Sequence, residues 1–160
     1  EGWNMGAWGY LAKEDYHPTS RVLSRFAQVR AWGGNYLLNA APNPDGEMPD
    51  NYYKHMAELT QWMKNHSEAC FDTQPGFDDL PSDTPSTRKG NATYIWILPA
   101  FQQESISYTV HPTEGTPVKA TLLRDHSTLP FTFDDDTLTI PFPLSKRVDQ
   151  VDIIKVEFDV

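Results

Sequence analysis

The sequence is poor in cysteine, in positive charge and in long apolar runs. Cys70 is the only cysteine among 160 residues, so this chain can form no internal disulfide and no cysteine-based zinc site of its own. Thirteen lysines and arginines stand against 22 aspartates and glutamates, a net charge of −9, which argues against a nucleic-acid partner. No apolar run approaches the roughly 20 residues that cross a bilayer, so we expect no membrane partner.

The composition that remains is that of a folded, loop-rich protein. Charged residues make up 22% and hydrophobic residues 39% of the chain, close to the averages for soluble globular domains. Thirteen prolines, five tryptophans and 12% aromatic residues indicate many loops and many flat apolar side chains. Such side chains suit sugar binding as well as core packing.

The first 75 residues have an α/β pattern. Residues 1–17 hold aromatic residues among glycines without a regular period, which indicates an ordered loop. Apolar residues at helical spacing predict a helix over about 19–31, and Tyr36–Leu38 is typical of a short strand buried on both faces. A second helix is expected from Asp50, as a cap, to about residue 64. Its apolar stripe is Tyr52, Met56, Leu59, Trp62 and Met63.

The pattern changes after Phe71. Residues 72–89 are rich in Asp, Pro, Ser, Thr and Gly, which predicts a linker or an exposed excursion. Short β-branched and aromatic runs follow and predict an antiparallel β-sandwich over 76–160 whose strands have one wet face. The predicted strands are Thr93–Leu98, Ser105–Val110, Val118–Leu123, Thr137–Ile140 and Val151–Val160. We therefore expect two domains, 1–75 and 76–160, of fold class α/β followed by all-β.

Three blocks in the first half carry a resemblance to a known family. The run GGNYLLNAAPNPDG at residues 33–46 resembles a signature late in the catalytic domain of α-L-fucosidases of glycoside hydrolase family 29. Trp8-Gly9-Tyr10 upstream, and Trp62 with Glu68-Ala69 downstream, stand in the family's order and at about its spacing. The resemblance implies that residues 1–75 are the C-terminal portion of a (β/α)8-like barrel, followed by a β-sandwich.

The same resemblance implies a function. Such enzymes are retaining exo-fucosidases that remove terminal α-L-fucose from glycans, with one carboxylate as nucleophile and another as acid/base. The family's nucleophile is an Asp upstream of the Trp-Gly-Tyr block, so we expect it to lie outside this chain. The implied partners are a fucosylated glycan and the N-terminal remainder of the catalytic domain. No cofactor is implied, and the implied location is secreted, periplasmic or lysosomal.

The resemblance also suggests site residues, each with a structural alternative. Glu1 is the candidate general acid/base, because many relatives carry a Trp-Glu pair there; alternatively it is a solvated terminal residue. Trp8 and Trp3 are candidate walls against the apolar face of the sugar, or packed anchors of the loop. Asn35 is a candidate substrate-binding residue with Asn39, or both amides hydrogen-bond the neighbouring backbone.

The histidines and the predicted β-sandwich lead to two further expectations. The five histidines have no metal-ligand spacing, so we expect no metal. The alternative to a fucosidase segment is a non-catalytic carbohydrate-binding or structural β-sandwich protein, with an inactive isolated segment as a third possibility.

Overall fold

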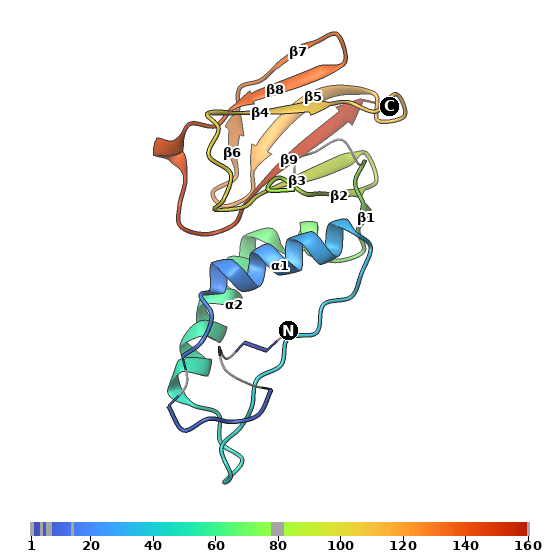
Figure 1. Cartoon of the computed structure of the whole chain (residues 1–160). Coiled ribbons are helices and arrows are strands. Elements are labelled where there is room, and N and C mark those ends of the chain that lie inside the picture. The colour runs from blue at the N-terminus through green and yellow to red at the C-terminus, as the bar shows by residue number, and fades with distance from the viewer. Residues whose placement is uncertain (1, 4, 6–7, 14, 78–81, 160) are drawn as a thin grey trace.

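The computed structural model describes residues 2–3, 5, 8–13, 15–77 and 82–159, and shows two α-helices against one face of a β-sandwich (Figure 1). Neither helix combines the length and the hydropathy of a bilayer-spanning segment. The elements in chain order are α1 (Thr19–Ala31), α2 (Asp50–Cys70), β1 (Gln74–Pro75), β2 (Ser86–Lys89), β3 (Ala92–Ile97), β4 (Ser105–Thr109), β5 (Thr116–Leu122), β6 (Ser127–Leu129), β7 (Thr132–Asp134), β8 (Thr137–Pro141), η1 (Leu144–Lys146, a 3₁₀ turn) and β9 (Asp152–Asp159).

The sandwich consists of two antiparallel sheets. One has the strand order β1-β2-β3-β9-β5-β6 and the other has the order β4-β8-β7. Their inner faces meet in a core of aliphatic and aromatic side chains, as aligned sandwiches require. The buried members of this core on the central strands are Ile95, Ile97, Ile106, Tyr108, Ala120, Leu122, Leu138, Ile140, Ile154, Val156 and Phe158.

The helices form a third layer on the outer face of the larger sheet, beneath β2 and β3 in Figure 1. Trp96 points to this side and packs against Trp62 of α2, with ring centroids 6.0 Å apart. The Trp62 Nε1–H donates to the Val151 carbonyl at 2.7 Å. Because both faces of β3 are covered, all of its residues are buried, and the prediction of one wet face is wrong for this strand.

The predicted helices form, with one change of length. α1 begins at Thr19 and ends at Ala31, as predicted, and Gly33 follows with a positive φ of 74°. α2 begins at Asp50 but continues to Cys70, well beyond residue 64. Its last turns are held because His66, Ala69 and Cys70 are buried, so packing on the sheet extends the helix past the predicted stripe.

The predicted cap of α2 is wrong. Pro49 occupies the cap position, and no side chain makes a capping hydrogen bond there. Asp50 lies inside the first turn instead, where a carboxylate interacts favourably with the helix dipole.

The predicted β-sandwich is confirmed. Each of the five predicted segments overlaps a strand, namely β3, β4, β5, β8 and β9. In β9 the alternation holds: Ile154, Val156 and Phe158 face the sandwich core, while Lys155 and Glu157 are partly exposed. Val160, which continued the predicted apolar face, lies outside the described residues.

The sequence missed β1, β2, β6 and β7. The stretch 72–89 is not simply an exposed excursion, because Thr73, Thr84, Ser86 and Thr87 are buried. The Thr87 hydroxyl donates to the Ala69 carbonyl at 3.2 Å. Hydroxyl side chains satisfied in this way give a buried strand a polar sequence. The division at residues 75 and 76 stays a prediction.

Tyr36–Leu38 is extended but is not a regular strand, which corrects the prediction of a strand buried on both faces. Tyr36 and Leu38 pack toward the helices, whereas the Leu37 side chain is 69% exposed. A parallel strand needs neighbours for its backbone groups, and the isolated bridge found next to this segment in the described ranges joins Asn39 to Gly2. A closed barrel is not formed by the described residues.

Candidate functional site

Two extended segments in the first half of the chain lie parallel to each other. Gly2 and Asn39 form a parallel bridge, and the Trp3 N–H donates to the Asn39 carbonyl at 2.8 Å. α1 separates the two segments in the chain, so the order is that of a βαβ unit. In such units the carboxyl ends of the strands share one edge, which is where barrel enzymes carry their site residues. The residues after Trp3 and after Asn39 therefore form the candidate site, called here the strand-end site.

Trp8 lies at this edge and is presented to solvent. The Asn39 Nδ2–H donates to the Trp8 carbonyl at 2.8 Å, so the amide hydrogen-bonds the backbone, one of the two roles considered for it. The same bond ties the aromatic loop to the end of the second extended segment. The Trp8 side chain is 63% exposed, which leaves its ring available for an apolar ligand face.

Trp3 is enclosed instead. Its side chain is 1% exposed and its Nε1–H donates to the His17 carbonyl at 3.1 Å. The ring meets Tyr16 and Tyr52 edge-on, with centroids 6.2 and 6.0 Å away. This burial favours the anchoring role, while contact of Trp3 with a sugar stays a prediction.

The remaining predicted site residues lie elsewhere. Asn35 is exposed and precedes Asn39 by about 13 Å of extended chain, toward the amino end of the segment. Parallel geometry therefore does not place it at the carboxyl edge, and its binding role stays a prediction. Glu1 lies outside the described residues.

A tight turn follows the second extended segment. The Asn43 Oδ1 accepts from the backbone N–H of Asp45 at 3.0 Å and of Glu47 at 2.8 Å, and Gly46 has a φ of +84°. This is the turn predicted from Asn-Pro-Asp-Gly chemistry. This turn lies in the loop that connects the second extended segment to α2.

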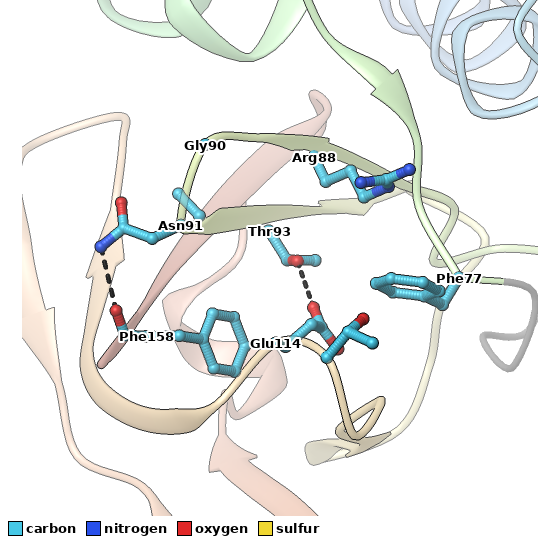
Figure 2. A pocket seen from close by; sticks show the side chains of 9 residues that line it. Phe77, Arg88, Gly90, Asn91, Thr93, Glu114 and Phe158 are labelled. Atoms are coloured by element: carbon cyan, nitrogen blue, oxygen red, sulfur yellow. Dashed lines mark hydrogen bonds between the residues drawn. The ribbon is translucent and has the colours of Figure 1, made fainter. Parts of the chain in front are cut away.

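A second hollow lies on the β-sandwich, between the β2–β3 turn and the segment 111–114. It has a volume of about 340 Å³ and is lined by Phe77, by residues of β2 and β3, by Thr113 and Glu114, and by Phe158. Figure 2 shows the β2–β3 hairpin on one side, Glu114 on the other and Phe77 at one end. We call it the hairpin cleft.

Glu114 is the buried charge of the hairpin cleft, with 8% of its surface exposed. Its Oε1 accepts from the Thr93 hydroxyl at 2.5 Å. Its Oε2 accepts from the Tyr108 hydroxyl at 2.5 Å and from the His111 N–H at 2.8 Å. Neutral donors therefore hold the carboxylate, and none of the ion pairs found among the described residues involves it.

The far end of the hairpin cleft is a stack of three flat groups. The rings of Phe77 and His111 are parallel, with centroids 4.1 Å apart. The Arg88 guanidinium lies 5.1 Å from the centre of the Phe77 ring, and its Nε–H donates to the Pro75 carbonyl at 3.1 Å. These contacts fix the direction of the guanidinium.

A third hollow, of about 600 Å³, lies between α2 and the β-sandwich and includes His66 and Asp152 in its wall. His66 stacks on Trp62 at 4.3 Å, and its Nδ1 lies 2.7 Å from the Trp62 carbonyl. That carbonyl can only accept, so Nδ1 carries the proton and Nε2 is an acceptor. Burial lowers the pKa of His66.

Asp152 is buried in the same wall beside Arg124. The Arg124 Nη1 donates to the two carboxylate oxygens at 3.0 and 2.8 Å. Burial nevertheless raises the pKa of Asp152 to about 6, because its desolvation outweighs the attraction of the guanidinium. This pair joins β9 to the segment after β5, and the Arg124 carbonyl accepts from Asn65 of α2 at 2.7 Å.

The described part of the chain brings no three His, Cys, Asp or Glu side chains into a group that could hold a metal ion. The hairpin cleft was missed by the sequence analysis because its residues come from four separated segments. The one available signal was Glu114, a lone acid in a turn between two predicted strands.

Comparison with known proteins finds alpha-L-fucosidases. The family model described as Alpha-L-fucosidase matches residues 1–68. Tissue alpha-L-fucosidase of Macaca fascicularis is 28% identical over 81% of this chain, and alpha-L-fucosidase of Dictyostelium discoideum is 24% identical over 76%. The chain spans 29% and 27% of these two relatives, respectively.

Solved structures share the fold along nearly the whole chain. Alpha-L-fucosidase isoenzyme 1 from Paenibacillus thiaminolyticus superposes with a TM-score of 0.83 at 24% identity, covering 99% of this chain and 39% of that one. The alpha-fucosidase of Thermotoga maritima in complex with fucose gives a TM-score of 0.74 at 21% identity, covering 98% of this chain and 38% of that one.

The parallel bridge, the helices and the β-sandwich form an α/β segment followed by an all-β layer. This chain is similar to alpha-L-fucosidases in sequence, through the family model over residues 1–68, and shares the fold of solved alpha-L-fucosidases along nearly its whole length.

Proposed function

We propose that this chain supplies the C-terminal part of a retaining exo-α-L-fucosidase that hydrolyses terminal α-L-fucose from glycans. In this proposal the nucleophilic aspartate comes from a segment outside these 160 residues, and that segment completes the barrel as the partner of residues 1–75. The location that goes with it is secreted, periplasmic or lysosomal. Some similar proteins are named plasma alpha-L-fucosidases.

One observation supports the proposal beyond the similarity to fucosidases. The bridge between Gly2 and Asn39, together with the hydrogen bond from Asn39 to the Trp8 carbonyl, joins the loops that follow two parallel segments at one edge. Barrel enzymes bind substrate at this edge. Trp8 then lies at the rim of the sugar pocket, where a flat ring packs on C–H groups and excludes water.

Leu37 supports the need for a completing segment. Its side chain is exposed between two residues that pack on the helices. We expect such exposure at the inward-facing position of a barrel strand when the remaining strands of the barrel are not present to cover it. Glu1 is proposed as the general acid/base. Its carboxyl group would protonate the leaving oxygen and then deprotonate water.

The experiment is an assay of the complete protein from the native reading frame with an aryl α-L-fucoside. We expect hydrolysis with α-L-fucose as the first product, seen by NMR, because a covalent glycosyl-enzyme gives retention. Trp8→Ala should lower kcat/KM about tenfold or more, from the lost ring contact, and Trp32→Ala, which changes another exposed tryptophan, should not. A folded complete protein without turnover would refute the proposal.

The role of Glu1 needs its own test in the complete protein. Glu1→Gln should slow substrates with poor leaving groups far more than activated aryl fucosides, because only the former need protonation of the leaving oxygen. Equal effects on both substrates would remove Glu1 from this role.

A further inference from the structure

The hairpin cleft combines chemical features that have no part in the strand-end site. A buried carboxylate, Glu114, forms one wall, and the half-exposed guanidinium of Arg88 stands at the Phe77 end (Figure 2). Ala92 and Phe158, both buried, contribute apolar surface to the lining. The volume of about 340 Å³ lies in the range of small-ligand pockets.

The Glu114 carboxylate can accept more hydrogen bonds than the described residues give it. A carboxylate offers about four lone-pair positions, two on each oxygen. Oε2 already accepts two hydrogen bonds, from Tyr108 and His111, whereas Oε1 accepts one, from Thr93. With respect to the residues that the structure describes, one acceptor position therefore remains on the oxygen that faces the β2–β3 hairpin in Figure 2.

Arg88 and Asn91 also have hydrogen-bonding groups left for a ligand: donors on Arg88 and an acceptor on Asn91. The Arg88 Nε–H is engaged with the Pro75 carbonyl, and its two Nη groups make no hydrogen bond or ion pair with the described residues. The Asn91 Nδ2–H donates to the Phe158 carbonyl at 2.9 Å, which fixes the amide and leaves its Oδ1 as an acceptor. Because the Phe77 stack and these bonds already order both groups, a ligand would bind without paying much for their immobilisation.

The charges decide the class of ligand. A ligand that carries charge of one sign only would be repelled by Glu114 if it is an anion and by Arg88 if it is a cation, so it would not use both groups. A neutral ring with two adjacent hydroxyl groups can donate to the carboxylate and accept from the guanidinium, while its C–H face covers the apolar surface. This is the chemistry of a pyranose.

We propose that the hairpin cleft is a second carbohydrate-binding site that takes a neutral pyranose through a pair of adjacent hydroxyls. Glu114 accepts from one hydroxyl and Arg88 donates to the other. The site lies on the β-sandwich, apart from the strand-end site, so it does not depend on fucosidase activity. In a glycosidase, such a site would bind one sugar unit of a glycan and so keep the rest of that glycan close to the enzyme.

The test is an NMR titration of the whole ¹⁵N-labelled chain with methyl glycosides of L-fucose, D-galactose and D-glucose. We expect at least one of them to shift the amide signals of Gly90, Asn91, Thr113 and Glu114 in a saturable way, with a Kd in the millimolar range. trans-1,2-Cyclohexanediol should shift the same signals, and cyclohexanol, which has one hydroxyl, should not.

Variants connect the shifts to the proposed groups. Arg88→Met keeps the apolar stem and should raise Kd about fivefold or more, and Asn91→Ala is a second variant that leaves the Phe77 stack intact. Arg25→Met, on the exposed side of α1, is the matched control and should leave Kd unchanged. Circular dichroism melting of each variant checks that it is folded.

Four results would overturn the proposal. The first is the absence of any amide shift at the cleft with all three glycosides, and the second is that cyclohexanol gives shifts equal to those of the diol. The third is that sulfate gives saturable shifts with the same pattern as the glycosides. The fourth is an unchanged Kd in folded Arg88→Met and Asn91→Ala. Sulfate binding would identify an anion site instead. None of these results bears on fucoside hydrolysis by the complete protein.

Discussion

The buried Asp152 should give the protein a stability component that falls as the pH rises. Its side chain is 2% exposed, and burial raises its pKa to about 6 although Arg124 contacts both oxygens. Asp125, three positions after β5 ends, is the natural control because it is exposed and its pKa is lowered by the Ser127 hydroxyl.

The sign and size of the Asp152 contribution to the free energy of unfolding follow from proton linkage. The folded state holds the Asp152 proton up to about pH 6, whereas an unfolded aspartate loses it near pH 4, so between these values the folded state binds more protons. The stabilisation is complete below about pH 4 and is lost as the pH rises through about 6. A shift of about two pKa units corresponds to roughly 3 kcal/mol between the two limits.

The assay is urea unfolding of the wild type and Asp152→Asn at pH 4, 5, 6 and 7. The difference between the two unfolding free energies should move in favour of the variant by about 2 kcal/mol from pH 4 to pH 7. The constant cost of leaving Arg124 without its carboxylate cancels in this change, as does the titration of His66. Asp125→Asn should show no change of this sign, and a pH-independent difference for Asp152→Asn would refute the reasoning.

Three further predictions follow from single contacts. Trp62→Phe keeps the packing but leaves the Val151 carbonyl without its donor, and should cost about 1–2 kcal/mol of unfolding free energy in urea. His66 should be less protonated in ¹⁵N NMR than an unfolded histidine at the same pH, because burial lowers its pKa; stability should therefore fall as the pH drops below about 6.5, where the unfolded histidine is protonated. Trp3→Ala should cost about 3–5 kcal/mol and Trp8→Ala less than about 0.5 kcal/mol in thermal unfolding, because the first ring is buried and the second is exposed.

The sandwich was predictable because its strands alternate between two environments of different polarity. In β9 every second residue enters the sandwich core, so the sequence alternates and the strand is visible. α1 was visible for the equivalent reason at helical spacing. β3 is buried on both faces, and its run of apolar residues identified a strand without showing that helices cover its second side.

The clearest missed element, β2, has polar residues at buried positions, because hydrogen bonds satisfy their side chains. Thr87 is buried in β2, where its hydroxyl donates to the Ala69 carbonyl and accepts from the Trp96 Nε1–H at 3.0 Å. No pattern in the sequence distinguishes such a threonine from one in a loop. The end of α2 was missed similarly, because the buried residue there is His66, whose ring is paired with the Trp62 carbonyl.

The strand-end site was predictable in part because it depends on local order. An extended segment, a helix and a second extended segment bring two loops to one edge, and Trp8 follows the first extended segment. Asn35 and Asn39 looked equivalent in sequence, since they flank the same run, and only the parallel direction of the bridge to Gly2 distinguishes the carboxyl end from the amino end. The hairpin cleft has no such local order, because Phe77, Glu114 and Phe158 meet only after the sheets are assembled.

The β-sandwich is physically tied to the strand-end site through the helices. Trp96 of the larger sheet packs on Trp62, and Trp62 belongs to the helix whose first turns hold Tyr52 against the buried ring of Trp3. Thr19 at the start of α1 donates to Glu58 of α2 at 2.7 Å, which joins the two helices at the same end. The sheet thus supports the helices, and the helices support the residues from which the Trp8 loop departs. A cavity made beneath Trp96 should therefore disturb the aromatic loop as well as the sandwich, since packed cores transmit strain instead of absorbing it locally.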